Sequence, residues 1–99
     1  MKLPFDTDLK DKVCVVTGGG GVLCGMFAKA IASCGAKVAI LDLREEAAIA
    51  VAEEITKDGG IAKGYAANVL KSEEMKAVRD AILKDFGTCD ILINGAGGN

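Results

Sequence analysis

The chain has 99 residues, enough for one small domain, and a net charge of −2 from 12 basic and 14 acidic residues. No basic stripe supports nucleic-acid binding, and no apolar run approaches the roughly 18 residues of a membrane span. The N-terminal segment lacks the apolar centre of a signal peptide, so we expect a cytoplasmic protein. Four cysteines without a C-x-x-C pair, and no histidine, argue against a metal site and favour reduced structural thiols.

Four apolar runs alternate with three segments of helical pattern along the chain. Strands are expected over residues 13–17, 37–42 and 61–69, and from 90 into the glycines after Asn94; helices are expected over 22–34, 44–59 and from 72 to Gly87. The order βαβαβαβ predicts an α/β fold with a doubly wound parallel sheet of Rossmann type. The crossovers are expected to be right-handed, and the doubly wound arrangement then places the first strand inside the sheet, in the strand order 3-2-1-4.

Individual residues indicate where some of these elements begin and which of their faces are apolar. One face of the first helix is expected to carry apolar side chains, those of Leu23, Phe27, Ala30, Ile31 and Cys34. Ser72 can cap the third helix. Cys14 and Cys89 lie next to predicted strands, where a thiol behaves as a small apolar side chain.

Four consecutive glycines separate the first strand from the first helix. Without Cβ atoms such a loop can turn sharply and bring its N–H groups close to a ligand, while the next helix adds unpaired N–H groups and a partial positive charge. Together these features predict a phosphate site, and the alternative is a flexible turn with no ligand. The residues expected at this site are Thr17, Gly18, Gly19, Gly20, Gly21, Val22 and Leu23.

Asp42 ends the second predicted strand, at about the 20-residue spacing that places an acid beside an adenosine ribose. Its carboxylate could accept hydrogen bonds from both ribose hydroxyls and would repel a 2′-phosphate, which favours NAD over NADP. Arg44, two residues further on, is a reservation because an arginine there could accept that phosphate. The alternative for Asp42 is a solvated helix cap.

The fourth predicted strand ends in the string NGAGG. Glycines at the carboxyl end of a strand let a dinucleotide pass close above it, and open α/β sheets bind ligands at this edge. An ordinary turn is the alternative. The residues expected to contact the cofactor here are Asn94, Gly95, Ala96 and Gly97.

Taken together, the T-G-x-x-x loop, Asp42 and the N-x-A-G string resemble the short-chain dehydrogenase/reductase family over essentially the whole chain. Val22 and Cys24 stand where the family usually has glycines. The resemblance implies further cofactor contacts at Leu43, Asn68 and Val69. Asn68 replaces the family's acid and would accept more weakly from the adenine amino group. The strings TGGGGVLCG and NGAGGN most resemble the D-mannonate oxidoreductase, or fructuronate reductase-like, branch.

The family resemblance implies hydride transfer between NAD and a sugar acid or similar alcohol or ketone. The family's catalytic Ser and Tyr-x-x-x-Lys residues come later in its longer chains, so no catalytic residue is assigned. Tyr65, the only tyrosine, is followed four residues later by Val69 rather than lysine, and is expected to serve in packing.

Residues 1–99 are therefore expected to form the N-terminal NAD(P)-binding part of a longer homo-oligomeric enzyme, inactive alone and prone to associate through an exposed fourth strand. The alternatives are a stand-alone dinucleotide-binding module without catalysis, or a flavodoxin-like phosphate binder.

Overall fold

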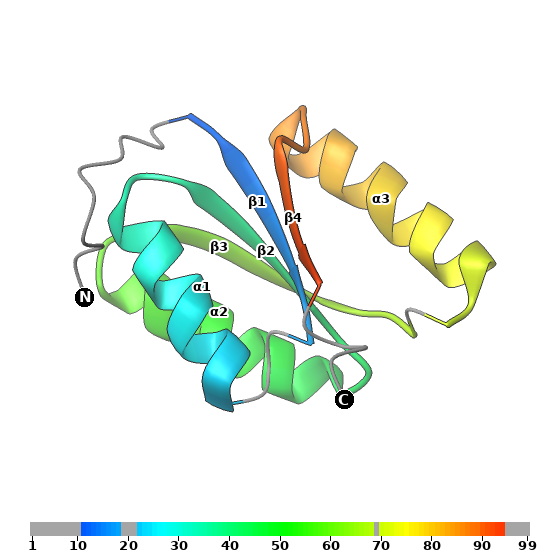
Figure 1. The fold of residues 1–99 in the computed structure, drawn as a ribbon, viewed down its shortest axis with the longest axis horizontal. Helices are drawn as coiled ribbons and strands as arrows, with labels where there is room; N and C mark the ends of the chain where they lie inside the picture. The colour runs from blue at the N-terminus through cyan, green and yellow to red at the C-terminus, as the bar shows by residue number, and fades with distance from the viewer. Residues whose placement is uncertain (1–10, 19–21, 69, 95–99) are drawn as a thin grey trace.

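A computed structural model describes residues 11–18, 22–68 and 70–94. Its elements are β1 (Val13–Thr17), α1 (Val22–Ser33), β2 (Lys37–Asp42), α2 (Glu45–Lys57), β3 (Ile61–Ala66), α3 (Ser72–Phe86) and β4 (Ile91–Asn94). The described strands form a parallel sheet in the order β3-β2-β1-β4. Figure 1 shows α1 and α2 on one face of this sheet and α3 on the other. The predicted α/β class, element order and strand order are therefore confirmed.

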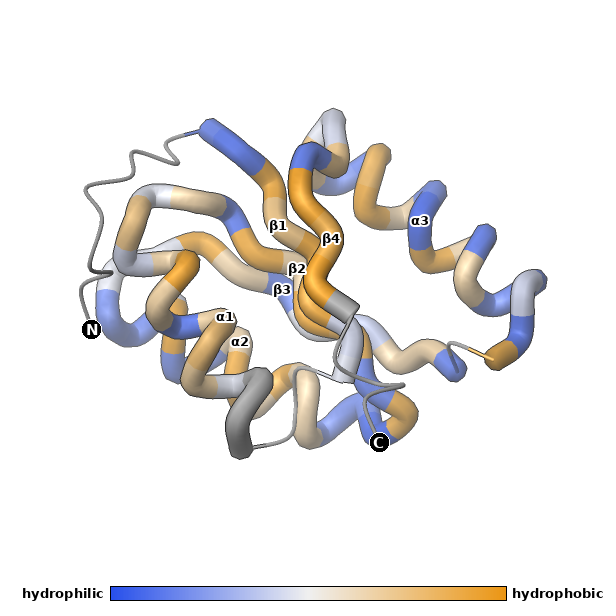
Figure 2. Tube along the Cα trace, viewed as in Figure 1, coloured by the Kyte–Doolittle hydropathy of each residue, from blue (hydrophilic) through white to orange (hydrophobic). Residues whose placement is uncertain are grey.

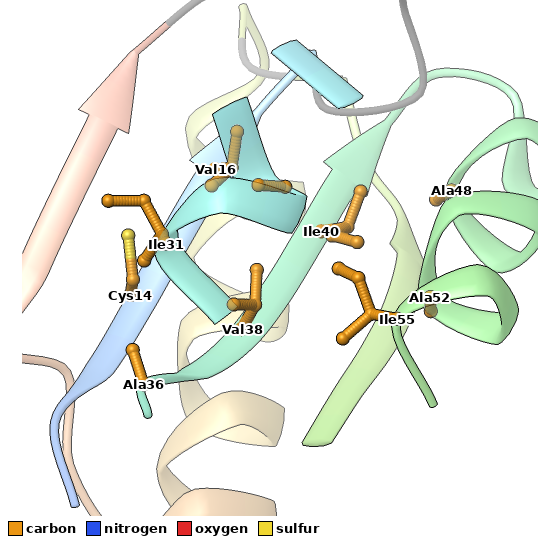
Figure 3. Close-up of a cluster of buried hydrophobic side chains, with 10 residues drawn as sticks. Cys14, Val16, Ile31, Ala36, Val38, Ile40, Ala48, Ala52 and Ile55 are labelled. Carbon is orange, nitrogen blue, oxygen red and sulfur yellow. The ribbon is translucent and has the colours of Figure 1, made fainter. Parts of the chain in front are cut away.

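The central strands are buried on both faces, as expected for a parallel sheet between helices. Alternate residues of β1 point to opposite faces, so Cys14 and Val16 join the core under α1 and α2, while Val13 and Val15 join the core under α3. Figure 3 shows the first of these clusters, in which side chains from β1, β2, α1 and α2 meet. Figure 2 shows hydrophobic residues along most of β4 and an alternation of hydrophobic and hydrophilic residues along α3.

The first helix buries only part of the apolar face that its sequence suggests. Ala30 and Ile31 are buried as expected, but Phe27 is 48% exposed and does not share their burial. The buried face includes Gly25, Ala28 and Ile31. These positions are three residues apart and share one face of the helix. Small side chains on the buried face let the helix lie close to the sheet, and the bulkier ring is turned outward.

The third helix also begins differently from the prediction. Ser72 is its first helical residue, and Lys71 occupies the N-cap position without a side-chain capping bond. The preceding strand ends at Ala66 rather than at Val69, and the backbone N–H of the next residue, Ala67, donates to the Asp42 carbonyl. Gly87 ends the helix in the left-handed region, at φ 86°, where glycine is favoured.

The described cysteines are free thiols in different surroundings. Cys14 is fully buried in β1, as expected of a structural thiol. Burial, with a smaller contribution from Cys89, raises the pKa of the Cys14 thiol to about 11. Cys89 is exposed instead, so the expectation that it behaves as an apolar strand neighbour is wrong.

Among the described residues, those on the sheet face that carries α3 leave part of that face uncovered. A groove of about 690 Å³ runs along α3 and is lined by residues that include Val15, Met75 and Leu92. The Leu92 side chain on β4 is 63% exposed. Within the described part of the chain, no helix combines the length and apolar character needed to cross a membrane.

Tyr65 packs in the core under α3, as predicted, and its hydroxyl also ties β3 to that helix. The hydroxyl donates to Asp85 Oδ2 over 2.7 Å, and Lys63 Nζ donates to the same oxygen over 2.8 Å. Burial, together with the bond to Asp85, raises the pKa of Tyr65. The hydrogen bond from Lys63, followed by that from Tyr65, lowers the pKa of Asp85.

This cluster predicts an acid-sensitive contribution to folding. Because the pKa of Asp85 is lower in the folded chain, the carboxylate stabilises the fold above its unfolded pKa of about 4, and this contribution is lost as the pH falls through the folded value. Urea unfolding measured between pH 7 and pH 3 should show a steeper loss of stability in the native protein than in Asp85→Asn. Parallel curves for the two proteins would contradict this assignment.

Candidate functional site

The carboxyl ends of the strands meet at one edge of the sheet. The parallel register places Thr17 of β1 opposite both Leu41 of β2 and Asn94 of β4, and places Asp42 opposite Ala66 of β3. The predicted site residues Thr17, Asp42 and Asn94 therefore end neighbouring strands at the same edge (Figure 1). Open α/β sheets bind their ligands just outside this edge.

Between β1 and β4, the helical connections change from one face of the sheet to the other. The connection after β1 passes through α1 on one face, and the connection into β4 passes through α3 on the other (Figure 1). The first turn of α1 begins at Val22 and carries no acidic residue. The N–H groups of this turn have no partner within the helix and give it a partial positive charge, so this edge is suited to an anionic group.

Thr17 and Gly18 shape the exit from β1. The Thr17 side chain is buried, and its hydroxyl donates to the Ile93 carbonyl over 3.4 Å, which joins β1 to β4. Gly18 has a φ of 69°, where a residue with a Cβ would be strained by about 1–2 kcal/mol. The predicted contacts Gly19, Gly20, Gly21, Val69, Gly95, Ala96 and Gly97 lie outside the described residues, and Val22 and Leu23 begin the backbone of α1.

Asp42 is half-buried at the tip of β2, and its orientation is set by the backbone that follows. Its Oδ1 accepts a hydrogen bond from the Arg44 N–H over 3.0 Å. Arg44 is the N-cap residue of α2, so this bond also organises the entry to that helix. The Arg44 guanidinium lies beside Glu46, with Nε 3.6 Å from Oε1, and the Leu43 side chain is 70% exposed.

Asn68 follows β3 and takes part in a network that the sequence did not suggest. Its side-chain Oδ1 accepts from the Leu70 N–H over 2.9 Å, and its own N–H donates to Glu74 Oε1 over 3.1 Å. Glu74 is the third residue of α3, a position from which a glutamate often reaches back to a backbone N–H before the helix. That tendency is the one signal that could have revealed Glu74 in advance.

The fold and this edge define a doubly wound α/β domain of Rossmann type. The sequence profile of the short chain dehydrogenases matches residues 12–99, and the chain belongs to that family.

Relatives of known sequence and structure align with nearly the whole of this chain. An uncharacterized oxidoreductase of Haemophilus influenzae is 54% identical over 99 residues, which cover 100% of this chain and 35% of that protein. The uncharacterized oxidoreductase UxuB of Bacillus subtilis is 46% identical over 97 residues, covering 98% and 35%. The crystal structure of a Haemophilus influenzae protein, provisionally assigned as a D-mannonate oxidoreductase and solved with bound NAD, has a TM-score of 0.91 at 55% identity, covering 95% and 34%. The chain thus spans about a third of the length of these relatives.

Proposed function

We propose that this chain forms the dinucleotide-binding part of an oxidoreductase that moves hydride between NAD and a sugar acid or similar alcohol or ketone. The position of the Asp42 carboxylate at the tip of β2, beside the ends of β1 and β3, carries the proposal. Family membership supports the reaction class. The NAD-bound relative supports the cofactor, and its provisional assignment supports the substrate class.

The described residues fit such a cofactor in three places. The first turn of α1 would face the pyrophosphate, together with Gly18 at the exit from β1. Asp42 would accept hydrogen bonds from the adenosine ribose, and Asn68 would lie beside the adenine. Leu43 and Asn94 complete this set at the same edge of the sheet. When bound, the nicotinamide supplies the group that accepts or donates hydride; the residues described here bind and orient it.

NAD is favoured over NADP by charge at the ribose site. A 2′-phosphate would approach the Asp42 carboxylate, and like charges close together repel. The Arg44 guanidinium could offset this repulsion by pairing with the phosphate. It already lies beside Glu46, however, and the Glu46 carboxylate competes with the phosphate for it. Because both side chains are well exposed, this pairing is weak, and we propose a preference for NAD rather than complete exclusion of NADP.

Residues 1–99 are proposed to be the N-terminal part of a larger homo-oligomeric enzyme. The relatives are about three times as long, and the groove along α3 offers apolar surface for further packing. A right-handed crossover leaving β4 toward a strand beyond it would place its helix on the same face as α3. The groove lined by Met75 and Leu92 lies on that face.

A cofactor titration of the protein expressed from its complete reading frame tests the proposal. NAD should bind at least about tenfold more tightly than NADP, a difference of about 1.4 kcal/mol. FMN should not bind, and NAD-dependent oxidation of D-mannonate should be measurable. Binding of NAD without turnover of D-mannonate or related sugar acids would favour the non-catalytic module instead. Binding of FMN alone would overturn the cofactor assignment.

A further inference from the structure

The loop between β3 and α3 is fastened at both ends by hydrogen bonds. The Ala67 N–H donates to the Asp42 carbonyl over 2.9 Å, and the Lys71 N–H donates to the Asn68 carbonyl over 3.0 Å. Asn68 thus sits in a segment joined by backbone to the residue proposed to bind the ribose. Its N–H points toward Glu74 rather than toward the sheet, since that carboxylate accepts it.

We propose that Glu74 is a positioning residue that holds Asn68 in place for recognition of the adenine base. This inference rests on the proposed dinucleotide-binding function. Glu74 acts from the first turn of α3, through the bond of its Oε1 to the Asn68 N–H. Its other carboxylate oxygen, Oε2, lies 3.8 Å from Lys71 Nζ in a solvent-exposed and therefore weak ion pair.

The side chain of Asn68 is held in one orientation by the same loop. The Leu70 N–H needs an acceptor, and the Asn68 Oδ1 supplies it at 2.9 Å. The amide therefore cannot turn over without losing that bond, and a carbonyl oxygen has a second lone pair for the adenine amino group. With Glu74 fixing the backbone and Leu70 fixing the amide, the oxygen is presented in a defined way.

The preference of the protein for one base of the dinucleotide over another is a quantity that a purely structural role of Glu74 would not change. The probe is the hypoxanthine analogue of NAD, in which a carbonyl oxygen replaces the adenine amino group that Asn68 is proposed to recognise. In the protein expressed from its complete reading frame, Glu74→Ala should reduce the preference for NAD over this analogue by roughly 3- to 10-fold, the range expected for one hydrogen bond. Glu74→Gln keeps an acceptor oxygen and should retain most of the preference. Glu73→Ala, an exposed acid in the same turn, is the matched control and should leave it unchanged.

A double-mutant cycle tests the coupling between the two residues. Asn68→Ala alone should reduce the preference for NAD over the hypoxanthine analogue, and adding Glu74→Ala should reduce it little further, because Glu74 acts through Asn68. Equal losses of affinity for NAD and the hypoxanthine analogue in Glu74→Ala would overturn the positioning role while leaving the proposed function intact. Failure of the unmodified protein to bind NAD would instead refute the proposed function itself.

Discussion

Replacing Asp42 by alanine should lower the affinity for NAD roughly 10- to 100-fold and affect NADP much less. Hydrogen bonds to a charged group contribute about 1.5–3 kcal/mol, and each 1.4 kcal/mol changes an equilibrium constant about tenfold. NAD would lose the carboxylate that accepts from its ribose hydroxyls. NADP would lose the same partner but would also escape repulsion of its 2′-phosphate. Isothermal titration calorimetry with both dinucleotides measures the change.

Two further variants separate the role of Asp42 in binding from its role in the fold. In the unmodified protein, Asp42 Oδ1 accepts a hydrogen bond from the Arg44 N–H over 3.0 Å. Asp42→Asn keeps an oxygen that can accept this bond but removes the negative charge. This variant should narrow the difference between NAD and NADP without lowering the thermal unfolding temperature as much as alanine does. Asp80→Ala removes an exposed acid on α3 and serves as the control. An unchanged NAD-to-NADP ratio in both Asp42 variants would show that this carboxylate does not bind the ribose.

The features that the sequence predicted well depend on local periodicity. Thr17 and Asp42 end β1 and β2, as expected, because each follows a short, fully apolar run with an abrupt change to polar or glycine residues. Gly59 and Gly87 follow α2 and α3 in the left-handed region, where only glycine is unstrained. The strand order then follows from a doubly wound sheet with right-handed crossovers, which together leave few other topologies.

What the sequence could not predict depends on contacts between distant elements. Which residues of α1 are buried depends on how closely the helix approaches the sheet, so Phe27 is exposed although it lies near the apolar stripe. Nothing in the string around Asn68 shows that its N–H will meet Glu74, because that bond depends on the path of the chain between β3 and α3. The buried hydroxyl of Tyr65 likewise finds its partner, Asp85, only when β3 and α3 pack together.

Gly64→Ala should destabilise the fold by about 1–3 kcal/mol, the range for overpacking of a well-packed interior. A Cβ at this position in β3 would lie 2.7 Å from the backbone carbonyl carbon of Ala48 and 2.7 Å from the Ile49 nitrogen in α2. Backbone atoms cannot move aside as a flexible side chain can, so α2 must shift away from the strand. Where no such contact exists, replacing glycine by alanine stabilises a protein by about 0.4–1 kcal/mol. At Gly64 we expect the opposite effect on the free energy of unfolding.

A graded series distinguishes this clash from a general intolerance of β3 to substitution. Valine favours strands more than alanine does, so Gly64→Val would be the more stable variant if the site had room, and the less stable one if α2 blocks it. Ala66→Val, at the exposed end of the same strand, should change the free energy of unfolding little. Urea unfolding of the three variants orders them directly. If Gly64→Val were as stable as the unmodified protein, the backbone of α2 could not lie as close to β3 as the distances at Gly64 indicate.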